Sequence, residues 1–208
     1  NLLKIGAYGM HGTPLKPPHG RGHSVMNWSL IEGRKKFTSY LFKLDKNVDS
    51  GTIVGLKEFD INYWDTCETL HFKYMLTMVR LILLNINRIK KKNSRYQKQD
   101  SENITYYKKR RPDDSLINWQ DTTINIYNFI RAVTKPYPAA FTYLKKVKLT
   151  LFKSQPFDTF LTWPLSKPGE ILEVFDNSFF LVKTLDSSLL VTEYDGFIGK
   201  KHKGMKLK

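Results

Sequence analysis

The sequence predicts an α/β protein in which strands, glycine-rich turns and a long helix precede a small β-rich domain. Two observations support this fold class. Strand-like runs and glycine-rich turns fill the first 60 residues, and apolar residues then recur at helical spacing. After Phe141 the pattern changes to short alternating segments that are separated by turn residues. We therefore expect a first domain at residues 1–119 and a second at residues 120–208.

The first part of the chain alternates between extended segments and turns. We expect a buried strand at residues 5–10 and a loop at residues 11–22, because the loop's three prolines exclude a helix interior. A short helix follows, with Ser24 as its N-cap and Gly33 at its C-terminal end. Two further strands then flank a loop that contains Asp49: residues 37–44 and 52–59.

The long helix has the strongest pattern in the chain. Asp65 and Glu68 have the spacing of a capping box at its start. Apolar residues then recur at helical spacing: Leu70, Phe72, Leu76, Val79, Leu83 and Ile86. The basic run Lys90–Lys92 suits the negative end of the helix dipole. We expect the polar segment 93–103 to be an exposed linker.

The second domain begins with a helix and continues as strands. Ile124, Tyr127, Ile130 and Val133 mark the helix, which Pro136 stops. Short strands separated by turn residues predict a small OB-like sheet or barrel: residues 147–151, 171–172, 179–183 and 189–192. We expect the basic tail, residues 200–208, to be disordered and solvated.

Composition limits the classes of protein that fit. With 208 residues and 41% apolar residues the chain can bury a core, and its single cysteine excludes an internal disulfide. No apolar run reaches the roughly 18 residues of a membrane helix, so we expect a cytoplasmic protein without a membrane partner. The net charge of +15 comes from scattered lysine runs, which favour RNA binding only weakly over a general compositional bias.

Pairs of candidate metal ligands are better explained without a metal. His19 and His23 are four residues apart, but prolines and glycines prevent the helix that would bring them together. Cys67 and His71 have the same spacing on a helix and no third ligand nearby. We predict no metal site. Aromatic residues near the domain junction could stack on a base but more often form core: Tyr106, Tyr107 and Trp119.

The most informative segment lies between Tyr8 and Gly51. It contains Gly9-Met10-His11-Gly12, then Gly20-Arg21-Gly22 and Asn27-Trp28, and finally Val48-Asp49-Ser50-Gly51. Taken alone, His11 is by default a surface or loop histidine rather than a catalytic one, and Asp49 is equally well explained as a turn residue. Their order and spacing resemble the folate-dependent formyltransferases, whose signature joins Asn-x-His, a Pro- and Gly-containing loop, a short helix and an Asp-x-Gly loop.

The resemblance implies a fold and a set of roles. The fold is the carboxyl-terminal part of a Rossmann-like formyltransferase domain followed by an OB-like domain, with the amino-terminal folate-binding half absent. We therefore expect the 208-residue chain to bind folate poorly by itself. His11 would manage protons and Asp49 would orient it, while Asn47, Val48 and Asp49 would contact formyltetrahydrofolate. In the loop, Lys16 and Arg21 could hold the diphosphate of a substrate or be solvated charges.

The substrate branch is indicated by Asn27-Trp28, which is similar to the nucleotide-sugar N-formyltransferases. Their substrate is the amine of a nucleotide-linked amino sugar, and the protein could form a homodimer. The alternative is methionyl-tRNA formylation, which the basic charge favours. A third alternative is a non-catalytic homologue, because Gly9 stands where the family has the asparagine that binds the formyl oxygen.

Overall fold

The computed structural model describes residues 5–91, 95–100 and 102–208. The chain forms two compact units: residues 1–29 with 34–110, and residues 30–33 with 111–208. We refer to them as the first and second unit. The domain limits inferred from sequence, 1–119 and 120–208, remain a prediction, since compactness alone does not define a domain.

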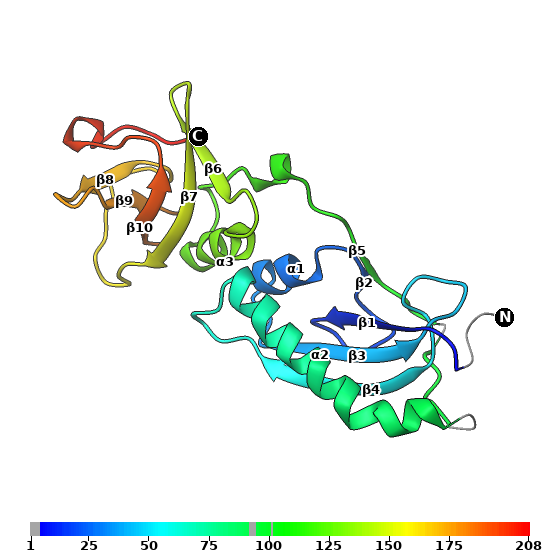
Figure 1. Ribbon diagram of the computed structural model, residues 1–208. Helices are drawn as coiled ribbons and strands as arrows, with labels where there is room; N and C mark the ends of the chain where they lie inside the picture. Colours follow the sequence, from blue (N-terminus) through cyan, green and yellow to red (C-terminus); the bar gives the residue numbers. More distant parts are fainter. Residues whose placement is uncertain (1–4, 92–94, 101) are drawn as a thin grey trace. The chain divides into compact units, whose positions relative to one another are not determined.

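The first unit contains a three-stranded antiparallel sheet in the order β1-β3-β4 (Figure 1). Its strands are β1 (Tyr8–Thr13), β3 (Lys36–Lys43) and β4 (Ile53–Asp60), and the short helix α1 (Val25–Ile31) precedes β3. The two later strands confirm the sequence prediction to within a residue or two. The first one corrects it, because His11 pairs with Tyr40 inside β1 and does not begin a loop.

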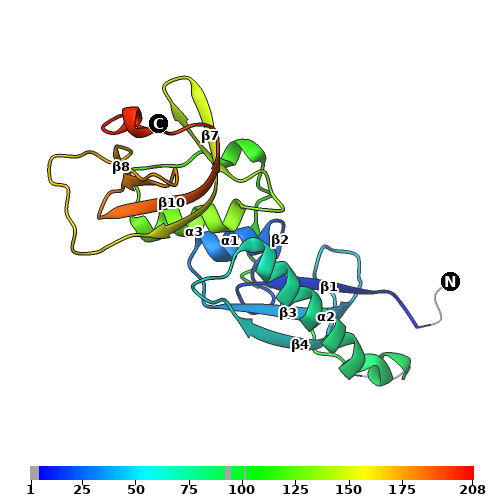
Figure 2. The ribbon, with the colours of Figure 1, turned by 60° about the vertical axis from the view of Figure 1, so that its left-hand side comes forward.

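Helix α2 (Cys67–Lys90) runs across this sheet, as Figures 1 and 2 both show. Its packing is carried by Leu41 of β3, Val54 of β4 and Ile89 of α2, which form one buried cluster. The helix was predicted, but the capping box was wrong. It is formed by Thr66 and Thr69, whose hydroxyl groups accept each other's backbone N–H. Asp65 instead forms an ion pair with Lys73.

The end of α2 and the segment after it differ from the expected exposed linker. Lys92 and residues 93, 94 and 101 lie outside the described residues. Gln97 forms a β-bridge with Ile53, and β5 (Tyr106–Tyr107) pairs in parallel with β2 (Arg21–Gly22). The segment is therefore part of the fold, because its backbone forms hydrogen bonds with β4 and β2 of the first unit.

The second unit packs helix α3 (Thr123–Val133) on a five-stranded antiparallel sheet (Figure 2). The 3-10 turn η1 (Pro112–Ser115) precedes α3. The sheet order is β6-β7-β10-β9-β8. Its strands are β6 (Ala140–Leu144), β7 (Val147–Pro156), β8 (Ile171–Val174), β9 (Phe180–Lys183) and β10 (Ser188–Asp195). The β-rich second part is therefore confirmed.

The basic tail is ordered, which corrects the expectation that it is disordered. It contains the 3-10 turn η2 (Lys200–His202), and Leu207 is buried at 1% exposure. Lys208 and Tyr143 exchange backbone hydrogen bonds of 2.9 Å in both directions. The tail is therefore held by the buried side chain of Leu207 and by hydrogen bonds of its backbone.

Candidate active site

His11 occupies the middle of β1, directly opposite Tyr40 of β3. Their neighbours Met10 and Leu41 face α2. Side chains alternate between the two faces of a sheet, so His11 and Tyr40 lie on the face away from that helix. The imidazole packs edge-on against the Tyr40 ring at a centroid distance of 5.5 Å, and its side chain is only 10% exposed.

The two imidazole nitrogens have different partners. Nε2 lies 3.2 Å from the carbonyl oxygen of Gly20, and Nδ1 lies 3.5 Å from Oδ2 of Asp49. The carbonyl and the carboxylate can both only accept, so the neutral ring can donate to one of them, whereas the protonated ring can donate to both. The sequence predicted that the two side chains approach each other, and this distance confirms it.

Asp49 lies in the loop between β3 and β4 with a left-handed backbone, φ 53°. Its Oδ2 accepts from the backbone N–H of Gly22 at 3.5 Å. The side chain of Gln99 stabilises this loop, because its Nε2 donates hydrogen bonds to the carbonyl oxygens of Asp49 at 2.8 Å and Gly51 at 2.7 Å. A residue in the left-handed region is strained unless neighbouring contacts fix it, and Gln99 supplies them.

Gln99 is the functional residue that the sequence reasoning missed. It lies in the polar segment expected to be an exposed linker, and no spacing or motif distinguishes it from the other glutamines. Its Oε1 accepts from Nη2 of Arg21 at 3.0 Å. One glutamine therefore connects the loop of Asp49 to the glycine-rich loop that carries Arg21.

Arg21 and Lys16 occupy different environments. Arg21 is 3% exposed, and its Nε has no hydrogen-bond partner within the part of the chain that the structure describes. Lys16 is exposed on the same loop. The structure therefore does not bring the two cations together at one accessible surface.

The negative charge of Asp49 acts on two tyrosines, which remain protonated. Burial and the negative charge of Asp49 raise the pKa of Tyr40 far above its usual value, which Arg21 offsets in part. Burial and the same carboxylate raise the pKa of Tyr74 on α2 to about 12. Tyr40 is fully buried, and among the described residues its hydroxyl has no hydrogen-bond partner. The site thus holds a phenol as a donor with spare capacity.

Gly9 is closely approached by the side chains of its neighbours. A Cβ at this position would lie 2.8 Å from Cδ2 of Leu44 and 3.0 Å from Cζ of Phe42. Phe42 is buried, so its ring has little room to move. Asn27, the asparagine next in sequence, points elsewhere: its Nδ2 donates to Sγ of Cys67 at 3.7 Å. The departure from the asparagine of the family is thus matched by its surroundings.

The remaining candidates are placed as follows. Asn47 and Val48 are exposed in the loop before Asp49, with Val48 at 65%. Trp119 is buried and donates to Oγ1 of Thr142 at 2.9 Å, as a core residue does. Trp28 stacks on Tyr107, and the guanidinium of Arg110 lies 5.1 Å above its ring. In the described ranges, no three His, Cys, Asp or Glu side chains are grouped to hold a metal.

Comparison with known proteins identifies the family. Residues 109–204 match the family described as formyl transferase, C-terminal domain. The chain is 34% identical over 172 residues to the bifunctional polymyxin resistance protein ArnA of Wigglesworthia glossinidia brevipalpis, a match that covers 82% of the chain. The chain belongs to the formyltransferase family. It spans 25% of the length of this ArnA.

Two solved formyltransferases have similar folds. An N-formyltransferase from Helicobacter canadensis, in complex with folinic acid and dTDP-3-aminofucose, is 22% identical with a TM-score of 0.69. The match covers 89% of the chain and 65% of that protein. Methionyl-tRNA formyltransferase from Clostridium thermocellum is 26% identical with a TM-score of 0.55, over 71% and 62% of the two chains. The α/β part followed by a β-rich part is therefore the formyltransferase arrangement that the sequence predicted. Across the described helices, none has the length and apolar character needed to cross a bilayer.

Proposed function

We propose that this formyltransferase moves a formyl group from formyltetrahydrofolate to the amine of a nucleotide-linked amino sugar. The observation that carries the proposal is the His11–Asp49 pair, 3.5 Å apart on a partly closed sheet face. Formyl transfer to an amine needs a group that takes the proton of the attacking nitrogen and a group that stabilises the resulting charge. The pair can do both.

The imidazole of His11 would take the proton of the attacking amine and return it to the folate nitrogen as the bond between that nitrogen and the formyl carbon breaks. Both ring nitrogens face acceptors, the carbonyl oxygen of Gly20 and Oδ2 of Asp49, so a second proton on the ring gives each acceptor a donor. Protonation converts the contact with Asp49 into an ion pair within a site that excludes most water, which stabilises the charged imidazole as it forms. Gln99 keeps the carboxylate in place through its bonds to the backbone of Asp49 and Gly51.

The loop before Asp49 fits the formyl donor. Val48 presents an exposed apolar side chain, and Asn47 beside it is exposed with its amide, a combination suited to a ring with polar edges. Asn47, Val48 and Asp49 would hold formyltetrahydrofolate, whose chemistry is to supply an activated formyl group. The oxygen of that group needs a donor in place of the missing asparagine, and among the described residues Tyr40 Oη and Arg21 Nε have no hydrogen-bond partner.

Three observations favour a nucleotide-sugar as the acceptor. Asn27-Trp28 resembles that branch, and the Helicobacter canadensis relative was solved with dTDP-3-aminofucose. Lys16 is the exposed cation of the glycine-rich loop and would contact the diphosphate, while buried Arg21 would act at short range on the reacting groups. Methionyl-tRNA is the second candidate, because the chain carries a net charge of +15.

The test is formyl transfer by the full-length protein with each acceptor in turn. We expect mass spectrometry to detect the formylated amine when formyltetrahydrofolate is mixed with a dTDP- or UDP-linked amino sugar, and not with methionyl-tRNA. The reverse preference would assign the tRNA reaction. Absence of product with both acceptors would support the non-catalytic homologue that Gly9 keeps open.

A further inference from the structure

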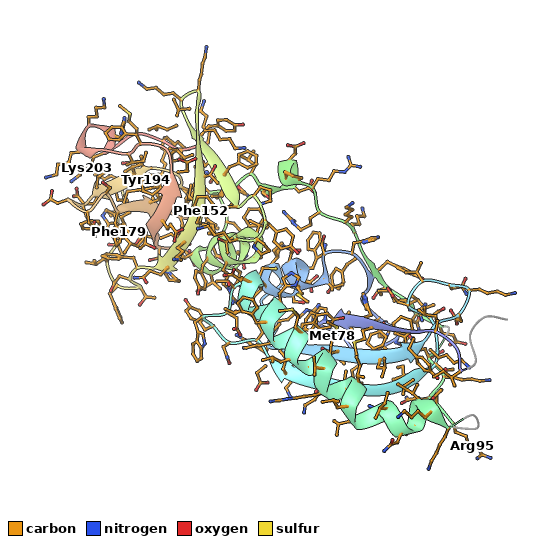
Figure 3. All side chains as sticks on the ribbon, viewed as in Figure 1. Met78, Arg95, Phe152, Phe179, Tyr194 and Lys203 are labelled. Atoms are coloured by element: carbon orange, nitrogen blue, oxygen red, sulfur yellow. The ribbon has the colours of Figure 1, made fainter. Side chains whose placement is uncertain are left out.

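Two lysine-rich runs that are far apart in the sequence meet in the second unit. Lys145, Lys146 and Lys148 lie in the β6–β7 hairpin, and the other run is the tail from Lys200 to Lys208. Leu144 forms a β-bridge with Leu207, so the tail is fastened to β6 beside the hairpin turn. Figure 3 labels Lys203 on this tail segment. Charge that is scattered in the sequence is therefore concentrated in space.

A cavity of about 420 Å³ opens between these two runs. Leu144, Leu149 and Met205 supply apolar side chains to its lining, and Phe197 forms an aromatic wall. A volume of this size is typical of pockets that bind small molecules. The cavity is separate from His11 and Asp49, which belong to the first unit.

The Phe197 ring is presented to the pocket and kept in position. It is 68% exposed, yet His202 packs against it edge-on at 5.7 Å, and the ammonium group of Lys201 lies 5.8 Å from its centre. Nδ1 of His202 accepts the backbone N–H of Gly199 at 2.9 Å. In the neutral ring, Nε2 therefore carries the proton and is a donor at the pocket.

The charge of the lining has one sign. Lys145 and Lys201 contribute to it, and no carboxylate of the described residues lies in the lining. Elsewhere on the tail, lysines are neutralised, as Lys200 is by Asp176 and Lys203 by Glu173. The lysines at the pocket have no such ion pair in the part of the chain that the structure describes. They are therefore available to an anion.

We propose that this pocket binds a nucleoside monophosphate. A flat, exposed aromatic ring favours a planar base over an alkyl chain, since bases stack on aromatic side chains. Cations at the rim suit the phosphate, and the apolar lining suits the sugar and base edges. The site is additional to the proposed formyl-transfer site and would let a nucleotide bind to the second unit independently of catalysis.

Calorimetric titration of the protein with uridine monophosphate tests this proposal. We expect saturable binding that weakens roughly tenfold or more in Phe197→Ala, because base–aromatic stacking is lost. Lys201→Glu should weaken it similarly and reduce its dependence on salt. Phe160→Ala and Lys167→Glu are matched controls, since both side chains are exposed on another loop of the same unit. Both should bind as the wild type does.

The outcome does not depend on formyl transfer, because His11→Ala should retain full binding of uridine monophosphate. Binding that disappears with His11→Ala but survives Phe197→Ala would place the nucleotide in the first unit and overturn the proposal. No binding to the wild type would do the same. If octauridylate binds and uridine monophosphate does not, the proposal is also overturned, because the surface would then bind an RNA strand.

Discussion

Strands β9 and β10 of the second unit bury their aliphatic residues, whereas helix α2 of the first unit leaves many of its aliphatic residues exposed. In the second unit the sheet residues Leu151, Phe180 and Leu189 are fully buried. In the first unit, helix α2 leaves a stripe of six apolar side chains between 37% and 68% exposed: Phe72, Met75, Leu76, Val79, Leu83 and Ile86. Single exposed apolar residues are ordinary, but a continuous stripe is a surface suited to contact with other groups.

The stripe teaches what helical spacing does and does not predict. Five of the six residues used to predict α2 lie on it, and only Leu70 is buried. The face toward the sheet includes polar residues, among them Thr77 and Asn85. Asn85 can be buried there for two reasons. Its amide donates a hydrogen bond to the carbonyl oxygen of Leu81, and Gly55 has no side chain that would clash with it. The helical spacing of the apolar residues therefore predicts that the segment is a helix, but it does not predict which face of the helix is buried.

The largest expected effect concerns chemistry, which we place in the first unit alone. His11→Ala and Asp49→Asn should each lower the turnover of formyl transfer by a factor of roughly 10²–10⁴ with little change in KM, since both act as charge develops. The control is His23→Ala, an exposed histidine of the same unit. Steady-state kinetics would contradict the assignment if either active-site variant kept wild-type turnover.

The contrast in burial predicts a contrast in stability. Leu151→Ala in β7 should lower the free energy of unfolding by about 2–5 kcal/mol, because it leaves a cavity in a closed core. Leu83→Ala on α2 should change it by less than about 0.5 kcal/mol. Urea denaturation followed by circular dichroism measures both. A comparable loss for Leu83→Ala would mean that the stripe is covered in solution.

Gln99 should have an intermediate effect that is confined to the site. Gln99→Leu removes the bonds to Asp49, Gly51 and Arg21, and we expect turnover to fall roughly tenfold, the equivalent of one or two hydrogen bonds. When Gln99→Leu is combined with Asp49→Asn, it should lower turnover much less, because the carboxylate that Gln99 positions is already gone. Gln155→Leu, on the exposed side of β7, is the control. Additive losses in the double variant would refute the positioning role.

The smallest effect is expected at alkaline pH. The pKa of Tyr74 is raised from 10.0 in the unfolded chain to about 12 in the folded one, first by burial and then by Asp49. The unfolded chain therefore releases this proton first, so the stabilising contribution is complete below pH 10 and is lost as the pH rises toward 12. Denaturation midpoints at pH 9 and 11 should differ less for Tyr74→Phe than for the wild type. Tyr143→Phe should leave the difference unchanged.

Much of the site could be predicted because its residues lie in short motifs. His11 and Asp49 are each marked by neighbouring glycines, and their approach follows from two adjacent strands. Gln99 could not be found in this way, because its role depends on a chain segment that returns from the far end of α2. Nor could the burial of Arg21, since a charged residue in a glycine-rich loop is ordinarily solvated.

The fold was predictable to a similar depth. Alternating segments after Phe141 gave the strands of the second unit, whereas the basic tail docks through buried Leu207 and through backbone hydrogen bonds. Isolated apolar residues among lysines carry no periodicity that a sequence pattern could detect.

The proposed chemistry depends on the register in which β1 pairs with β3. His11 faces Asp49 only because it is opposite Tyr40. A shift of one residue between these strands would move the imidazole to the side of α2 and bring Met10 or Gly12 to the carboxylate. Such a protein could keep its secondary structure and compactness and still be inert. A one-residue deletion within β1 would therefore separate folding from activity, which spectroscopy of the backbone alone would fail to notice.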